Sequence, residues 1–179
     1  MPTDQPKTDI SAADPDHPFA APEDDVLALE RFLPYRLSVL ANTVSRALAR
    51  QYQERFGLNI PQWRVMAVLG RFPDLSANEV AEKTAMDKVM VSRAVAGLLQ
   101  DGRLERRLSP TDRRRSSLRL SRDGHRVYAQ IVPLAQAYER ALVEALGPED
   151  MSAMDRAIDR LLSAGQSIDI GKRSPSASR

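Results

Sequence analysis

Apolar residues recur at helical spacing over most of the chain and alternate at strand spacing in one short stretch. A period near 3.6 indicates amphipathic helices, whereas strict alternation indicates a half-buried strand. The helical pattern predicts helices that begin near residues 34, 61, 77, 88, 122 and 148. The alternation of Ser117–Leu120, after the looser Leu104–Leu108, predicts a two-stranded hairpin. The sequence therefore predicts a mainly α fold with one small β-hairpin.

Two short helices near the middle of the chain have strong start and stop signals. Ser76 and Glu79 have the spacing of a capping box, in which each side chain bonds the other residue's amide. This helix should reach about Thr84, and Asp87 should cap the next one after a tight turn. Gly102 can take the left-handed conformation that ends the second helix. A helix-turn-helix followed by a hairpin is the order of a winged helix-turn-helix.

The second of these helices has one face free to contact DNA. The apolar side carries Val91, Ala94, Val95, Leu98 and Leu99. The opposite side is mostly small and carries Arg93, which suits a guanine, and Val89, which suits a thymine methyl. An ordinary solvated helix face is the alternative reading.

The hairpin is rich in arginine. Residues 103–126 hold nine arginines against three acidic residues, a net charge of +6. Arginine suits phosphate and narrow minor-groove contacts, so the hairpin tip is expected to contact the DNA backbone or minor groove. Asp112 at the tip either holds a neighbouring arginine or is a simple turn residue. The candidate DNA-binding residues are Ser76, Lys88, Val89, Ser92, Arg93, Arg113, Arg114 and Arg115.

Charge is segregated along the chain. Residues 1–25 carry a net charge of −6 and the rest carries +8, which favours a polyanionic partner for the folded part. The chain has no cysteine, which excludes disulfides, thiolate metal sites and cysteine redox sensing. No apolar run approaches the length of a membrane span and the N-terminus lacks a signal-peptide core, so we expect a cytoplasmic protein with no membrane partner.

Enzymatic activity is not expected. The two histidines, His17 and His125, have no sequence neighbours suited to a triad or a metal site. Phosphate loops and dinucleotide fingerprints are absent from the sequence. We therefore expect no catalytic residue, no metal and no cofactor.

The predicted organisation is one domain between two tails. Residues 1–25 form an acidic arm expected to be disordered, and residues 166–179 form a flexible tail. Within residues 26–165, the winged core spans 58–121, flanked by helices over 26–57 and 122–165. These outer helices carry more apolar surface than a small winged core can cover, which favours a homodimer over an intramolecular helical bundle.

The chain resembles the MarR family of winged helix-turn-helix transcriptional regulators over about Leu27 to Leu162. The resemblance rests on the helix order and on three motifs: Met86-Asp87-Lys88 leading into Val91-Ser92-Arg93, Asp101-Gly102-Arg103-Leu104-Glu105-Arg106, and Pro110-Thr111-Asp112-Arg113-Arg114 followed by Leu118-Arg119-Leu120-Ser121. It implies a homodimer with interleaved terminal helices that binds double-stranded DNA. It also implies a repressor released by a small, often aromatic and anionic effector, such as an aromatic acid or its derivative. Ser121 stands where the family usually has threonine.

The resemblance also implies an effector site in a cleft between the dimerisation helices and the winged lobe. Its candidate residues combine an aromatic wall with polar or cationic anchors: Arg36, Asn42, Trp63, Arg64 and Tyr128. Trp63 is also well suited to ordinary core packing. The alternative function is a winged-helix module for protein–protein or RNA contact without specific DNA binding.

Overall fold

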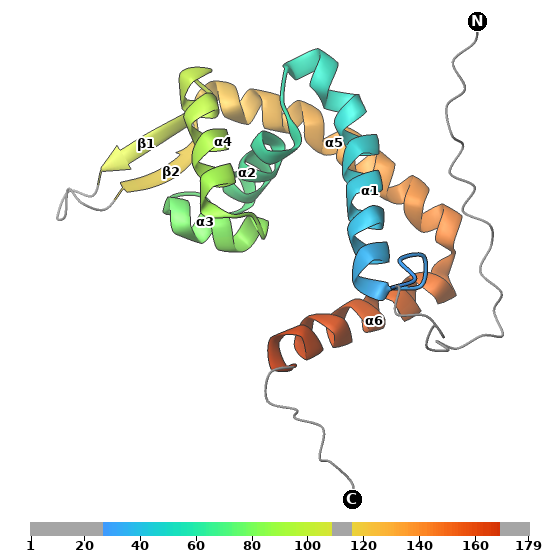
Figure 1. Cartoon of the computed structure of the whole chain (residues 1–179). Helices are drawn as coiled ribbons and strands as arrows, with labels where there is room; N and C mark the ends of the chain where they lie inside the picture. The colour runs from blue at the N-terminus through green and yellow to red at the C-terminus, as the bar shows by residue number, and fades with distance from the viewer. Residues whose placement is uncertain (1–26, 109–115, 169–179) are drawn as a thin grey trace, which may run out of the picture. The chain divides into compact units, whose positions relative to one another are not determined.

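The computed structural model describes residues 27–108 and 116–168 (Figure 1). The chain forms two compact units, Met1–Ser45 and Arg46–Arg179, and the boundary between them lies within the first helix. The second unit holds every helix after the first, together with the hairpin.

The described residues contain six helices and two strands in the predicted order. Their bounds are α1 Leu33–Phe56, α2 Ile60–Arg71, α3 Ala77–Thr84, α4 Lys88–Gln100, β1 Leu104–Leu108, β2 Ser116–Leu120, α5 Arg122–Leu146 and α6 Pro148–Ser167. Several bounds differ slightly from the sequence prediction, since α1 and α2 each begin one residue before Pro34 and Pro61. Strand β2 begins one residue before the predicted start at Ser117, and α6 continues two residues beyond Gly165. Helix α5 continues without a break through Pro133.

Side-chain caps begin four of the helices. Ser76 and Glu79 form the predicted capping box at α3, and Asp87 accepts a hydrogen bond from the Met90 amide at α4. Ser121 caps α5 by accepting from the Gly124 amide. A second capping box, formed by Asn59 and Gln62 at α2, was not predicted. Because these caps satisfy amides that a helix start leaves free, they fix where each helix begins.

The core of the second unit forms around α2. This helix contacts α3, α4, β2 and α5. The largest fully buried side chains come from all of these elements, from the end of α1 and from the loop before α2: Tyr52, Leu58, Met66, Leu69, Leu98, Leu118, Ile131, Val65, Val80 and Val91. The buried face of α4 is the predicted one, since Val91, Ala94, Val95 and Leu98 are all buried. Helix α4, which the sequence predicts to contact DNA, is therefore packed into the core by one face and exposes the other face to solvent.

The hairpin pairs β1 and β2 antiparallel, with Leu104 opposite Leu120 and Arg106 opposite Leu118. Leu118 and Leu120 are buried, as the alternation predicts. Leu75, just before α3, adds a single bridge to β2, where its carbonyl accepts from the Leu118 amide at 2.7 Å. The base of the hairpin is thus bonded to the segment that leads into the helix-turn-helix.

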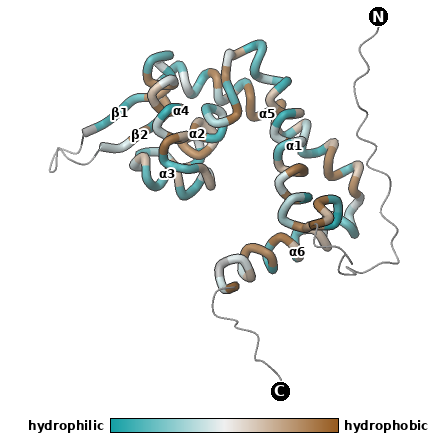
Figure 2. Tube along the Cα trace, in the orientation of Figure 1, coloured by the Kyte–Doolittle hydropathy of each residue, from teal (hydrophilic) through white to brown (hydrophobic). Residues whose placement is uncertain are grey.

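Apolar side chains stay exposed on the outer helices of each unit. In the first unit, Leu29, Phe32 and Leu33 are exposed. In the second unit, α5 and α6 expose Leu142, Val143, Leu146, Met154, Ile158, Leu161 and Leu162. Figure 2 shows apolar residues recurring along both α5 and α6. They lie in the outer segments from which the sequence predicted a dimer interface, and a single chain leaves them uncovered.

Candidate nucleic-acid interface

A tight turn sets the angle between α3 and α4. Ala85 takes the left-handed conformation with φ of 52°, which is unusual for a residue with a Cβ. The Met86 amide then donates to the Ala81 carbonyl, and Met86 is buried in the core. Two buried residues of α3, Val80 and Ala81, pack in the same core. The turn is therefore held by a hydrogen bond and by burial, so α4 is presented in one orientation.

The exposed face of α4 carries the candidate residues that the sequence placed there. Lys88, Val89, Ser92 and Arg93 are all exposed, and the Val89 side chain is 60% exposed. Ser76 is half-buried, with its hydroxyl oxygen accepting from the Glu79 amide at 3.3 Å. That oxygen still carries a hydroxyl proton, which can donate to an acceptor such as a phosphate.

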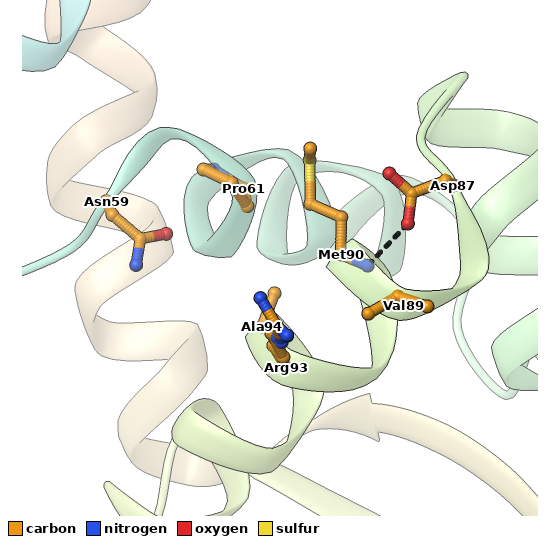
Figure 3. Close-up of a pocket in the computed structure, with 7 residues that line it drawn as sticks. All are labelled: Asn59, Pro61, Asp87, Val89, Met90, Arg93 and Ala94. Carbon is orange, nitrogen blue, oxygen red and sulfur yellow. Dashed lines mark hydrogen bonds between the residues drawn. The ribbon is translucent and has the colours of Figure 1, made fainter.

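A recess with a volume of about 310 Å³ opens beside this face, where the start of α4 lies against the start of α2. Figure 3 shows Asn59 and Pro61 on the α2 side, and Met90, Arg93 and Ala94 on α4. Asp87 and Val89 complete the lining. The sequence analysis did not include Asn59, Pro61 or Met90 among its site residues. A helical wheel treats α4 alone, so it cannot show that the N-terminus of α2 flanks the same surface.

The described part of the hairpin has both paired and unpaired arginines. Arg119 donates through Nε and Nη2 to one Glu105 oxygen, at 3.1 and 2.8 Å, directly across the two strands. Arg106 and Arg107 on β1 are exposed and form no ion pair with the residues that the structure describes. The predicted tip residues Arg113, Arg114 and Arg115, with Asp112, lie outside the described residues. The net charge of +6 already includes Glu105, and the structure shows that Arg119 is the arginine it pairs with.

A junction of hydrogen bonds joins the hairpin base to three helices. The Arg103 guanidinium donates to the Phe56 carbonyl at the end of α1, at 2.5 Å. The Arg103 carbonyl accepts from the Ser121 amide at 3.0 Å, and the Ser121 hydroxyl donates to the Gly102 carbonyl at 2.7 Å. Gly102 has φ of 67°, the left-handed conformation predicted at the end of α4. This junction positions β1 and the start of α5 relative to α4.

Aromatic side chains of three helices meet at Trp63. Its ring lies 5.6 Å from that of Tyr52 and 6.0 Å from that of Tyr128, nearly parallel to the latter. Tyr52 is 1% exposed, and burial raises its pKa to about 12, partly offset by the positive charge of Arg64. The structure thus brings Trp63, Arg64 and Tyr128 together with Tyr52, which the sequence analysis did not list.

The other two effector candidates lie in the first unit. Arg36 and Asn42 are exposed on the N-terminal half of α1. Trp63 itself is nearly buried and belongs to the hydrophobic core, in agreement with the packing role that the sequence left open.

The described residues contain neither a membrane-spanning helix nor a metal-binding cluster. Among them, no helix is long and apolar enough to cross a membrane. Nor do they include a group of three or more histidine, cysteine, aspartate or glutamate residues placed to hold a metal ion.

Comparison with known proteins finds similarity to one family. A family model described as the MarR family matches residues 56–115. The chain is 24% identical over 108 residues to the HTH-type transcriptional regulator BilQ of Clostridium symbiosum, and the match covers 60% of this chain and 75% of BilQ. The resemblance to MarR-family transcriptional regulators is therefore confirmed.

Solved structures agree on the fold. A MarR/EmrR family transcriptional regulator from Acinetobacter sp. ADP1 has a TM-score of 0.73 at 22% identity, covering 79% of this chain and all of that one. BpsR of Bordetella bronchiseptica, whose DNA binding is regulated by 6-hydroxynicotinic acid, has a TM-score of 0.63 at 22% identity, covering 73% of this chain and 98% of BpsR. The fold is a winged helix-turn-helix of the MarR type.

Proposed function

We propose that this chain, which resembles MarR-family transcriptional regulators, is a sequence-specific DNA-binding repressor that acts as a homodimer on a pseudo-palindromic operator. One observation carries the proposal: α4 is held in the core by one face, while its opposite face presents Lys88, Val89, Ser92 and Arg93 to solvent. The major groove of B-DNA admits an α-helix whose N-terminal residues reach the base edges.

Each residue of this face has a role in the proposal. Arg93 is suited to bidentate contact with a guanine, and Ser92 can reach a base or a phosphate. Lys88 and Ser76, at the starts of α4 and α3, are suited to phosphates that fix the position of the helix. On the hairpin, Arg106 and Arg107 join the tip residues Arg113, Arg114 and Arg115 as proposed contacts to the DNA backbone or minor groove.

Dimerisation supplies the symmetry of the operator. The apolar side chains left exposed on α5 and α6, and those of the first unit, are the proposed interface. A two-fold dimer would place two copies of α4 in successive major grooves on one face of the DNA, about 34–36 Å apart. Sedimentation equilibrium tests this step directly, and a monomer at micromolar concentration would refute it.

A small aromatic acid, or a derivative of one, is the proposed effector. Tyr128 is half-buried and stacks on Trp63, so it is the aromatic ring of this cluster that an effector could contact, and Arg64 supplies a positive charge near Tyr52. The relation of BpsR to 6-hydroxynicotinic acid supports this chemistry. Arg36 and Asn42, in the first unit, remain candidate effector contacts. A panel of aromatic acids that leaves DNA affinity unchanged would refute the effector class without affecting the proposal of DNA binding.

The DNA-binding proposal is tested by fluorescence anisotropy with DNA fragments selected from random sequence by the full-length protein. Arg93→Ala should cost about 1–3 kcal/mol of specific binding, whereas nonspecific binding should change much less. Arg93→Lys is the matched control, because it keeps the charge but loses the bidentate fork. If Arg93 only neutralised phosphate, Arg93→Lys would bind like the wild type.

A winged-helix module for protein–protein or RNA contact is the competing function. Such a module would show equal affinity for the selected and scrambled duplexes, with an unchanged specificity in both Arg93 variants. Tight binding that depends on sequence and weakens with salt would exclude it.

A further inference from the structure

The recess between α2 and α4 combines polar residues with exposed apolar side chains, in a place where solvent should favour polar ones. We define this recognition recess by its lining residues Asn59, Pro61, Asp87, Val89, Met90, Arg93 and Ala94. Met90 is 41% exposed and Val89 is 60% exposed, although both are apolar. Apolar side chains gathered at the start of a DNA-reading helix are costly to leave in water, so a partner that covers them would be favoured.

The charges around the recognition recess argue against a phosphate as that partner. Arg93 supplies one positive charge at its edge, and the Asp87 carboxylate supplies one negative charge. Asp87 is fixed there, because its Oδ1 accepts from the Met90 amide at 2.8 Å (Figure 3). A phosphate would meet a carboxylate of like charge, whereas a base edge carries no net charge.

Base edges in the major groove include one apolar group, the C5 methyl of thymine. Pro61, Val89 and Met90 offer the kind of surface that such a methyl contacts, whereas Ala94 is buried. Arg93, on the same rim, is placed to take a guanine of a neighbouring base pair.

We propose that the recognition recess is a thymine-methyl sensor: Pro61, Val89 and Met90 cover the C5 methyl of one thymine in each half-site. The inference rests on the proposed function, because it concerns the same face of α4. It adds α2, through Pro61, to the elements that determine sequence preference.

The test uses the full-length protein and a duplex selected from random sequence. Each thymine is replaced in turn by deoxyuridine, which lacks only the methyl, and affinity is measured by anisotropy. One thymine in each half-site should lose about four-fold in affinity, the value expected for one buried methyl-sized group. Replacing that thymine by 5-bromodeoxyuridine should restore the affinity, since bromine fills the volume of the methyl.

Two matched variants connect this effect to the recognition recess. Met90→Leu keeps an apolar side chain of similar size and should keep the deoxyuridine effect. Met90→Gln has a similar length but is polar, and it should reduce the effect to less than two-fold. Because Met90 is not part of the buried core, both variants should fold, which circular dichroism verifies.

Each alternative outcome has a definite meaning. The inference is overturned if no deoxyuridine replacement changes the affinity. In that case, a loss of affinity in Met90→Gln that is equal for all duplexes would assign the recess to contact with the DNA backbone. A deoxyuridine effect that persists unchanged in Met90→Gln also overturns it, because the methyl is then read elsewhere. If the selection returns no preferred sequence, the proposed function fails, and the inference fails with it.

Discussion

The close approach of Gly124 to Arg103 predicts a destabilising glycine-to-alanine change inside a helix. A Cβ at residue 124 would lie 2.0 Å from the Arg103 carbonyl oxygen, well inside any allowed contact. That oxygen also accepts from the Ser121 amide, so the obstacle is backbone that a bond holds in place. Moving it would cost about 1–3 kcal/mol for overpacking and about 1 kcal/mol for the lost hydrogen bond.

Helix propensity acts in the opposite direction, because alanine is about 1 kcal/mol better than glycine in a helix interior. The net expectation for Gly124→Ala is therefore a loss of about 1–3 kcal/mol. For a chain of this size, each 1 kcal/mol lowers the melting temperature by about 2–4 °C. Thermal unfolding at fixed protein concentration measures this shift through the fluorescence of Trp63, the only tryptophan in the chain.

Two other glycines serve as controls. Gly165→Ala on α6 meets nothing within 4 Å, so its melting temperature should stay the same or rise slightly. A Cβ at residue 70 would lie 2.6 Å from the Tyr128 ring. Because a side chain can shift more easily than backbone, Gly70→Ala should lose less stability than Gly124→Ala. A Gly124→Ala protein as stable as the wild type would refute the reasoning.

Four further predictions concern the α3 cap, the Arg103 junction and the buried Tyr52. Ser76→Ala should cost about 1 kcal/mol in urea unfolding, and an unchanged midpoint would argue against the cap. Hydrogen bonds with Ser76 lower the pKa of Glu79, so the stabilisation they give is present above pH 4.5 and is lost as the pH falls through the lowered pKa. The free energy of unfolding of Glu79→Gln should therefore depend less on pH in the acid range than that of the wild type. Arg103→Ala removes a charged donor from the Phe56 carbonyl and should cost about 1–3 kcal/mol by the same assay, a loss that Arg103→Lys should partly recover. Burial raises the pKa of Tyr52 from 10.0 to about 12, so its contribution to stability is present below pH 10 and is lost as the pH rises toward 12. In Tyr52→Phe, the free energy of unfolding should therefore depend less on pH over that alkaline range. A pH dependence equal to that of the wild type would contradict the burial effect.

Local signals account for most of the fold that the sequence predicted. The Ser76–Glu79 capping box, the Asp87 cap and Gly102 lie within a few residues of the helix ends that they determine, so one stretch of sequence contains the cause and its effect. The buried face of α4 and the inward leucines of β2 follow from spacing alone.

Features that depend on distant parts of the chain were missed for a physical reason. The recognition recess joins Pro61 to Met90, and spacing along α4 carries no information about the start of α2. The cross-strand pair of Glu105 and Arg119 depends on the register of the hairpin, which a charge count ignores. Tyr52 has the helical spacing of a core residue, and only the packed structure places its ring beside Trp63.

The bond between Leu75 and Leu118 has a consequence for the DNA that this protein can use. It holds the base of the hairpin to the segment before α3, while the Ser121 bonds hold the same base to the end of α4. With both ends of the helix-turn-helix bonded to it, the hairpin base cannot tilt independently of α4. In the proposed complex, α4 reads one set of bases and the hairpin contacts the DNA at another point of the same half-site. The number of base pairs between these two places is then constant. Operators that differ in length should differ only in the spacer between their two half-sites.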